Sequence, residues 1–175
     1  MQKLCRLLLA FILASFSAEA YSGPKGLYIL EYPVGMPNVS LISEHNKTLP
    51  ILNTNADLTI FVFWSQTCAP CLREMKHLES FYPKAAKDNI DVILVSPASD
   101  WRSNKEERLF LTKYGAPTIP FYNDVKNKLS LSLGIGSTPY TVIMDKNGKK
   151  VATIQGEADW SSKNFYKKIK KLVKD

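Results

Sequence analysis

Residues 61–75 are FVFWSQTCAPCLREM, an apolar run that leads into a polar turn containing two cysteines. Because the run from Phe61 to Trp64 is rich in aromatic and β-branched side chains, it predicts a buried strand. Apolar residues then recur at the spacing of an amphipathic helix, at Leu72, Met75, Leu78 and Tyr82. Cys68 is therefore expected where a strand turns into a helix, at or near the helix N-terminus.

That position predicts a reactive thiol. Unpaired backbone N–H groups and the positive end of the helix dipole stabilise a thiolate, so the pKa of Cys68 should be lowered and Cys68 should be the nucleophile. Cys71 lies one turn further along, deeper but within bonding distance, which suits a resolving thiol. A pair of thiols that cycles with a disulfide forms a redox couple.

Two other interpretations of the pair are weaker. A structural disulfide between Cys68 and Cys71 would close so small a loop that it restricts the unfolded chain little. A zinc site needs four ligands, and the two histidines, His45 and His77, do not form a second paired-ligand motif. We therefore expect no metal and no bound cofactor.

The N-terminus has the pattern of a signal peptide. Lys3 and Arg6 precede an apolar segment at 7–16, and Ala18-Glu19-Ala20 fits a cleavage site. We expect export to the periplasm or another extracytoplasmic space, with cleavage after Ala20; a retained membrane anchor is the alternative. Cleavage would also remove Cys5, leaving the paired cysteines as the only thiols of an exported chain, which argues against a disulfide scaffold.

After residue 20, the sequence predicts an extended leader at 21–37 with little regular structure, followed by one domain at 38–175. The formal net charge of the 175-residue chain is +7, and lysines crowd the last residues. Spacing of apolar residues at 165–173 predicts a terminal helix that packs on the core with a solvated basic face. Contact of that face with a membrane surface or an acidic partner is the alternative. We expect a monomer that does not bind nucleic acid.

The order of predicted elements indicates an α/β fold. A short N-terminal hairpin is expected from Val39–Ile42 and Leu49–Leu52, with His45 in its turn. Strands, helices and a final hairpin then follow, the hairpin turning at Asn147-Gly148. We expect Pro83 to kink the first helix or to end it at Tyr82. The further elements are strands at 59–64, 92–95 and 118–122 and helices at 104–114 and 125–133, which together predict a mixed sheet with helices on both faces.

Two motifs carry a family resemblance. Residues 63–75 have the pattern Phe-Trp-x3-Cys-Ala-Pro-Cys-x2-Glu-Met, and residues 134–148 have Gly-Ile-x2-Thr-Pro-x5-Asp-x2-Gly. With the order of elements over 39–173, they resemble the thioredoxin-like superfamily and, within it, the exported TlpA-like thiol–disulfide oxidoreductases. The resemblance implies a three-layer thioredoxin-like fold with an N-terminal β-hairpin extension.

The resemblance also implies roles for particular residues. Pro139 would be cis and lie opposite the cysteine pair, and Thr138 would present backbone groups to a substrate, with Trp64 as a further substrate-binding residue. Glu74 would help to move the proton of the resolving thiol, because Val62 stands where thioredoxin has a buried aspartate. An ordinary strand-entry proline and a glutamate that complements the helix dipole are the respective alternatives.

The chain departs from the family pattern at two positions. Thr67 stands where much of the superfamily has tryptophan, and Lys76 stands where the family usually has proline. Neither change removes a reacting group, but Thr67 makes the surface beside the first sulfur less apolar.

The expected function is reduction of partner disulfides outside the cytoplasm. The partners would be exported proteins, as in cytochrome maturation or oxidase assembly, and a membrane or exported redox protein would recharge the pair. Ala-Pro between the cysteines favours a reductant over an oxidant. A Cu(I)-binding or metal-delivery protein that uses the same two thiolates is the main alternative. A disulfide isomerase is a weaker one, since 21–37 is too short for a convincing dimerisation module.

Overall fold

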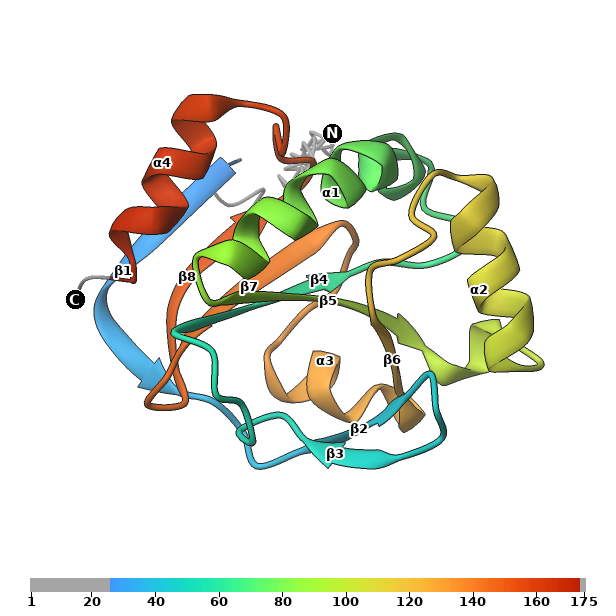
Figure 1. Cartoon of the computed structure of the whole chain (residues 1–175). Coiled ribbons are helices and arrows are strands. Elements are labelled where there is room, and N and C mark those ends of the chain that lie inside the picture. The colour runs from blue at the N-terminus through green and yellow to red at the C-terminus, as the bar shows by residue number, and fades with distance from the viewer. Residues whose placement is uncertain (1–25, 174–175) are drawn as a thin grey trace, which may run out of the picture.

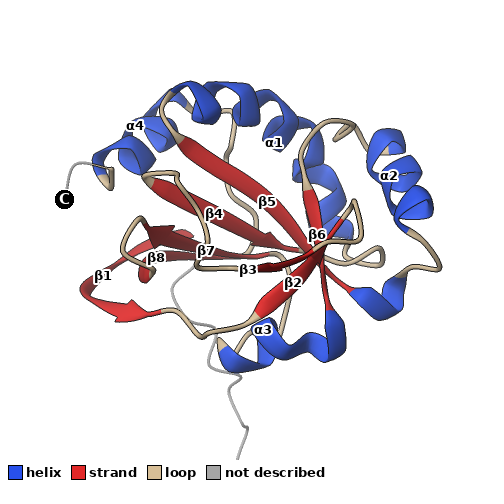
Figure 2. Ribbon diagram, turned by 60° about the horizontal axis from the view of Figure 1, so that its bottom comes forward, coloured by secondary structure: helices blue, strands red, loops and turns tan. Residues whose placement is uncertain are grey.

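The structure is a computed structural model that describes residues 26–173. The predicted signal peptide and the first residues of the predicted leader lie outside this range. One eight-stranded mixed sheet, in the order β1-β8-β7-β4-β5-β6-β2-β3, forms the centre of the molecule (Figure 1). Helices α1, α2 and α4 lie on one face and the short helix α3 lies on the other (Figure 2). The mixed sheet with helices on both faces is confirmed.

The strands are β1 (Gly26–Gly35), β2 (Ser40–Ser43), β3 (Thr48–Pro50), β4 (Leu58–Phe63), β5 (Ile90–Pro97), β6 (Phe121–Asp124), β7 (Tyr140–Asp145) and β8 (Lys149–Gln155). The helices are α1 (Ala69–Lys87), α2 (Asn104–Lys113), α3 (Lys128–Ser132) and α4 (Lys163–Lys171). Single turns of 3-10 helix occur at η1 (Ala98–Asp100) and η2 (Val125–Asn127).

Strand β4 lies in the middle of the sheet, parallel to β5 and antiparallel to β7. All of its residues are buried, because each face of the strand meets a separate core. Ile60 and Val62 pack among residues of α1, whereas Phe61 and Phe63 pack beside Leu129 of α3. This explains why the strand is a continuous apolar run rather than an alternating one.

Helix α1 follows β4 after a short turn and packs its apolar face on the sheet. The helix continues to Lys87 with Pro83 inside it, so the predicted end at Tyr82 is not observed. Proline removes one backbone hydrogen bond, but Phe81 and Ala85, two positions before and after Pro83, are buried in the core. Packing of this face therefore outweighs the local cost of the proline.

The segment at 26–35 corrects another expectation. Instead of having little regular structure, these residues form the edge strand β1, which pairs antiparallel with β8. Pro33 is compatible with an edge strand because no strand lies beside its outer side. The pairing partner is more than a hundred residues away in the chain, so local proline and glycine signals could not reveal it.

The remaining elements agree closely with expectation. The β2–β3 hairpin, with His45 in its turn, is present and extends the sheet beside β6. The β7–β8 hairpin turns at Asn147-Gly148, where Asp145 Oδ1 accepts hydrogen bonds from two backbone N–H groups. Strand β6 begins three residues later than predicted, at Phe121.

Helix α4 packs on the same face as α1, with Ile169 completely buried, as expected for a terminal helix on the core. Its lysines lie on its outer side, and one of them, Lys170, forms an ion pair with Asp88 at 2.8 Å. No helix within residues 26–173 has the length and apolar character needed to cross a membrane.

Candidate active site

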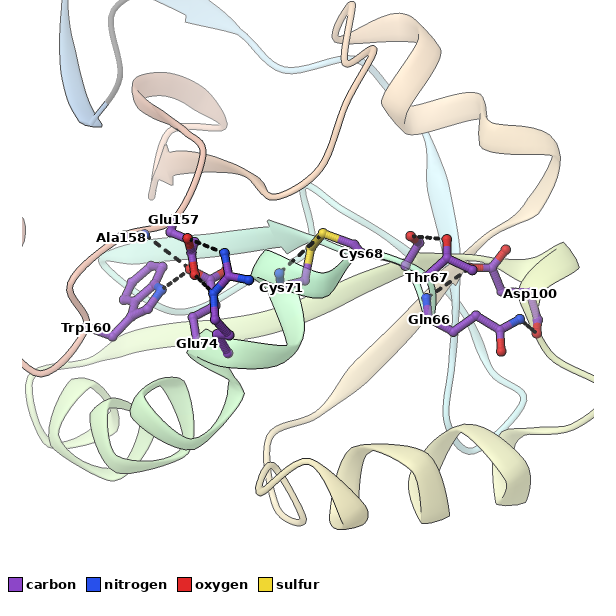
Figure 3. The surroundings of a disulfide bond; sticks show 11 residues. Gln66, Thr67, Cys68, Cys71, Glu74, Asp100, Glu157, Ala158 and Trp160 are labelled. Atoms are coloured by element: carbon purple, nitrogen blue, oxygen red, sulfur yellow. Dashed lines mark hydrogen bonds and ion pairs between the residues drawn. A yellow bond between two sulfur atoms is a disulfide. The ribbon is translucent and has the colours of Figure 1, made fainter.

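The two cysteines lie where β4 gives way to α1 (Figure 3). Cys68 is the N-cap of α1, and its sulfur accepts a hydrogen bond from the backbone N–H of Cys71 at 3.3 Å. The two sulfurs form a disulfide of 2.04 Å. Cys68 is 8% exposed and Cys71 is 0% exposed, so Cys68 is the sulfur that an incoming partner can reach.

The helix N-terminus is built by local sequence. Pro70 occupies one of the first two positions of α1, where a missing backbone N–H costs nothing. The N–H of Cys71 donates to the Cys68 sulfur, and this bond together with the positive end of the helix dipole favours negative charge there. Once the disulfide is reduced, this environment therefore favours the thiolate form of Cys68.

The Thr138–Pro139 peptide bond is cis, in agreement with the family resemblance. Pro139 immediately precedes β7, whose first residue, Tyr140, pairs with Phe63 at the end of β4. The cis bond therefore lies beside the strand end that leads into the cysteine turn. Thr138 lines a cavity at this edge of the sheet.

This cavity has a volume of about 250 Å³ and opens between the ends of β4, β5 and β6 and the segment before Pro139. Trp64 and Thr138 both line it. The Trp64 side chain is completely buried and packs against Trp101 and Phe110, with ring centroids 5.5 and 6.1 Å away. Contact of Trp64 with a substrate stays a prediction, because its side chain mainly fills the core in this structure.

Glu74 is buried close to the disulfide, one turn after Cys71 on the same helix. Its Oε2 accepts hydrogen bonds from the backbone N–H of Ala158 at 3.1 Å and from Nε1 of Trp160 at 3.2 Å (Figure 3). The pKa of Glu74 is raised to about 7: burial is the main cause, the two hydrogen bonds oppose it, and the negative charge of Glu157 adds a smaller upward contribution. A carboxyl group that titrates near neutral pH is suited to accept and return a proton.

The position of Glu74 disfavours a simple dipole role. The first turn of α1 contains no acidic residue, and Glu74 lies beyond it. Its carboxylate is bonded to the loop after β8 rather than to its own helix. Val62, at the position of the thioredoxin aspartate, is fully buried among apolar side chains, and Glu74 is the buried carboxyl on the same helix as Cys71.

Ala158 and Trp160 were not identified from the sequence. Both belong to the loop between β8 and α4, which is far from the cysteines in the chain but reaches α1 in space. The same loop is tied to α1 by Arg73 and Glu157, whose side chains form two hydrogen bonds of 2.9 and 2.8 Å. The local sequence offered one signal for this contact, namely the isolated apolar Trp160 just before the polar N-terminus of α4.

Sequence reasoning also missed a second buried carboxyl group, Glu107 of α2. Its two oxygens accept hydrogen bonds from Ser96 and Asn123, each at 2.7 Å. Burial raises the pKa of Glu107 to about 7, against the effect of these hydrogen bonds. Ser96 also accepts a bond from Trp101, which packs against Trp64, so the cluster supports the residues behind the cysteine turn.

The surface beside Cys68 is polar. Gln66 and Thr67 are exposed, and Gln66 donates a hydrogen bond to the backbone oxygen of Asp100 at 2.7 Å (Figure 3). Thr67 therefore leaves the approach to the sulfur less apolar than a tryptophan would. Within residues 26–173, no cluster of three or more histidine, cysteine or acidic side chains could hold a metal ion.

Comparison with known proteins identifies the class. A family model described as thioredoxin-like matches residues 55–150, which include both cysteines and Pro139. The chain belongs to this thioredoxin-like family, in agreement with its sheet topology.

The curated relatives of the chain include thiol-disulfide oxidoreductases named ResA. The chain is 32% identical over 94 residues to thiol-disulfide oxidoreductase ResA of Geobacillus thermodenitrificans (strain NG80-2), covering 54% of this chain and 52% of the relative. It is 26% identical over 121 residues to the protein of the same name from Bacillus thuringiensis (strain Al Hakam), covering 69% and 68%. The chain thus spans about half the length of the first relative and about two thirds of the second.

A solved structure supports the fold. The crystal structure of a putative thiol:disulfide interchange protein DsbE from Chlorobium tepidum has a TM-score of 0.69 at 16% identity. The match covers 82% of this chain and 99% of that one. At this identity the likeness concerns the fold alone.

Proposed function

We propose that this protein is an exported thiol–disulfide oxidoreductase that reduces disulfides in partner proteins. The observation that carries the proposal is the arrangement of the two sulfurs: Cys68 is reachable at the N-terminus of α1, and Cys71 is buried behind it. The relatives named thiol-disulfide oxidoreductase ResA support the same chemistry.

In the first step, the Cys68 thiolate attacks one sulfur of a partner disulfide. The partner S–S bond breaks, its other sulfur leaves as a thiolate, and a mixed disulfide forms between the partner and Cys68. Thr138 and Pro139 precede β7 at the end of β4 that leads into the cysteine turn, and an extended partner segment would bind there through its backbone.

In the second step, Cys71 releases the partner. The Cys71 thiol passes its proton to Glu74, and the resulting thiolate attacks the sulfur of Cys68. The bond between Cys68 and the partner breaks, and the partner sulfur leaves as a thiolate. The partner has then gained two electrons, and this protein holds the Cys68–Cys71 disulfide.

A further redox protein, in the membrane or exported, would reduce the disulfide again. The proposed partners are exported proteins whose cysteines must stay reduced, as for haem attachment or copper loading during cytochrome assembly. The signal-peptide pattern at 1–20 supports an extracytoplasmic location. The lysines on the outer side of α4 would attract an anionic membrane surface.

The test is to follow reduction of a peptide disulfide by the reduced protein, with the Cys68→Ser/Cys71→Ser double variant as control. Equilibration with glutathione buffers then gives the direction of exchange. A potential near the thioredoxin value of about −270 mV supports a reductant, and one near the DsbA value of about −120 mV contradicts it. Stoichiometric Cu(I) binding without disulfide reduction would replace the proposal with metal delivery.

A further inference from the structure

We propose that the loop at 156–160 is a positioning element for Glu74, holding Oε2 with two donors and leaving Oε1 as the oxygen that exchanges the proton of Cys71. Ala158 and Trp160 would act through Glu74, to which both donate hydrogen bonds. The inference rests on the proposed function, because it says which residues orient Glu74 for the transfer of the Cys71 proton described there.

The two oxygens of Glu74 have different surroundings. Both donors, the Ala158 N–H and the Trp160 indole, bond to Oε2. Within residues 26–173, Oε1 of Glu74 accepts no hydrogen bond. The only side-chain nitrogen or oxygen in this range that is both enclosed and without a partner is Nε1 of Trp64, so Oε1 is not enclosed. Oε1 therefore keeps contact with solvent, and a proton can be added to it without breaking an existing bond.

The orientation of the Trp160 indole is determined by its neighbours. Phe81 of α1 and Phe165 of α4 pack edge-to-face against it, with ring centroids 5.0 and 5.3 Å away. Trp160 is itself buried, so the ring has little freedom to turn. The indole N–H is thus held toward Glu74 before any reaction begins.

The loop also places a charge near Glu74. Glu157 is exposed and raises the pKa of Glu74, while its own charge is paired with Arg73. Two nearby ionisable residues in the sequence, His77 on α1 and Asp159 in the loop, are exposed, and Lys84 and Tyr166 line the pocket beside Trp160. On α4, Lys163 and Lys167 border the pocket on the outer side of Trp160.

The loop therefore both raises and lowers the pKa of the Glu74 carboxyl group. Burial and Glu157 favour the protonated form, and the two donors favour the ionised form. Removing a donor should therefore raise the pKa of Glu74, and removing the charge of Glu157 should lower it. A loop that merely packs against α1 would not produce shifts of opposite sign.

The test is the pKa of Glu74, measured by carbon-13 NMR of its side-chain carboxyl group and assigned by the loss of the signal in Glu74→Gln. Trp160→Phe keeps a ring but loses the donor, and should raise this pKa by roughly 1 unit or more, since a hydrogen bond to a charged group is among the stronger ones. Glu157→Gln, a surface change that will not prevent folding, should lower it. Trp101→Phe is the matched control, because that indole donates to Ser96 instead and should not shift the pKa of Glu74.

The same variants are then compared in the release of a partner from Cys68. The pH midpoint of this step should move upward in Trp160→Phe, and the shift should vanish when Glu74→Gln is also present. An unchanged or lowered pKa of Glu74 in Trp160→Phe, or a raised one in Glu157→Gln, overturns the positioning role even if disulfide exchange is normal. Absence of exchange in the unchanged protein instead contradicts the proposed function and leaves the NMR result to decide the role of the loop.

Discussion

The backbone nitrogen of Cys71 lies 3.3 Å from the sulfur of Cys68 and donates a hydrogen bond to it. The bond belongs to the first turn of α1, where N–H groups have no partners within the helix. It therefore connects the reactivity of one cysteine to the backbone of the other. This relationship leads directly to a prediction about the reduced protein.

In the reduced protein, the pKa of the Cys68 thiol should lie below the value of about 8.5 for a free cysteine. The N-terminus of α1 stabilises the thiolate, and partial exposure lets a reagent reach it. The measurement is the pH dependence of alkylation in Cys71→Ser, where Cys68 alone of the pair reacts. Alkylation at the rate of an unstructured cysteine across the whole pH range would refute a thiolate stabilised by the helix.

Exchange of Cys68 for serine should abolish disulfide reduction, because the accessible nucleophile is lost. Exchange of Cys71 should instead leave a stable mixed disulfide with the partner, since no second thiol can release it. Mass spectrometry of each variant after incubation with a disulfide peptide separates the two outcomes. Equal residual turnover in both variants would contradict the roles of Cys68 as nucleophile and Cys71 as resolving thiol.

Glu74→Gln should slow the release of the partner by about 10-fold or more at neutral pH, since a general base commonly contributes at least that factor. The pKa of Glu74 is raised to about 7, so the ionised base accumulates as the pH rises through 7. The rate of release in the unchanged protein should therefore increase across this range, and the variant should lose that increase. Single-turnover measurements from pH 5 to 9 test the difference; superimposable profiles would leave Glu74 with a structural role only.

The buried carboxyl group of Glu107 should affect how the stability of the protein depends on pH, rather than catalysis. Its pKa is raised to about 7 in the folded protein, against about 4.3 in an unfolded chain. Between these values the folded state holds more protons than the unfolded state, so the free energy of unfolding should fall as the pH rises from about 4.3 to 7 and level off above that. The loss from this group is at most roughly 4 kcal/mol.

Glu107→Gln should flatten this part of the stability curve, because an amide cannot ionise. Glu74 has a shift of the same sign, so some dependence on pH should remain in the variant. Urea unfolding at several pH values between 4.5 and 8 gives the comparison, with Glu31→Gln on the exposed strand β1 as control. A curve for Glu107→Gln that parallels the control would show that Glu107 does not titrate with a raised pKa.

Local patterns were sufficient for the centre of the molecule. The run from Phe61 to Trp64, the cysteine turn and the Asn147-Gly148 hairpin were all predicted, because each depends on side chains only a few positions apart. The cis bond before Pro139 was predicted as well, through family resemblance rather than through local chemistry.

Predictions failed where distant parts of the chain meet. Residues 26–35 carry turn-forming glycine and proline, yet they become a strand because β8 offers them a partner. Pro83 does not end α1, because the helix is held on both sides by the core. In each case a tertiary contact outweighed a local preference.

The amino-acid sequence alone determined the order of the strands and helices from β2 onward and the placement of Cys68 at a helix N-terminus, since both depend on neighbours along the chain. Only the tertiary structure decided which donors meet Glu74 and which groups bond to the carboxyl of Glu107. Those properties depend on burial and on groups brought together from distant parts of the chain, and desolvation of a carboxyl group exists only once the surrounding chain has folded.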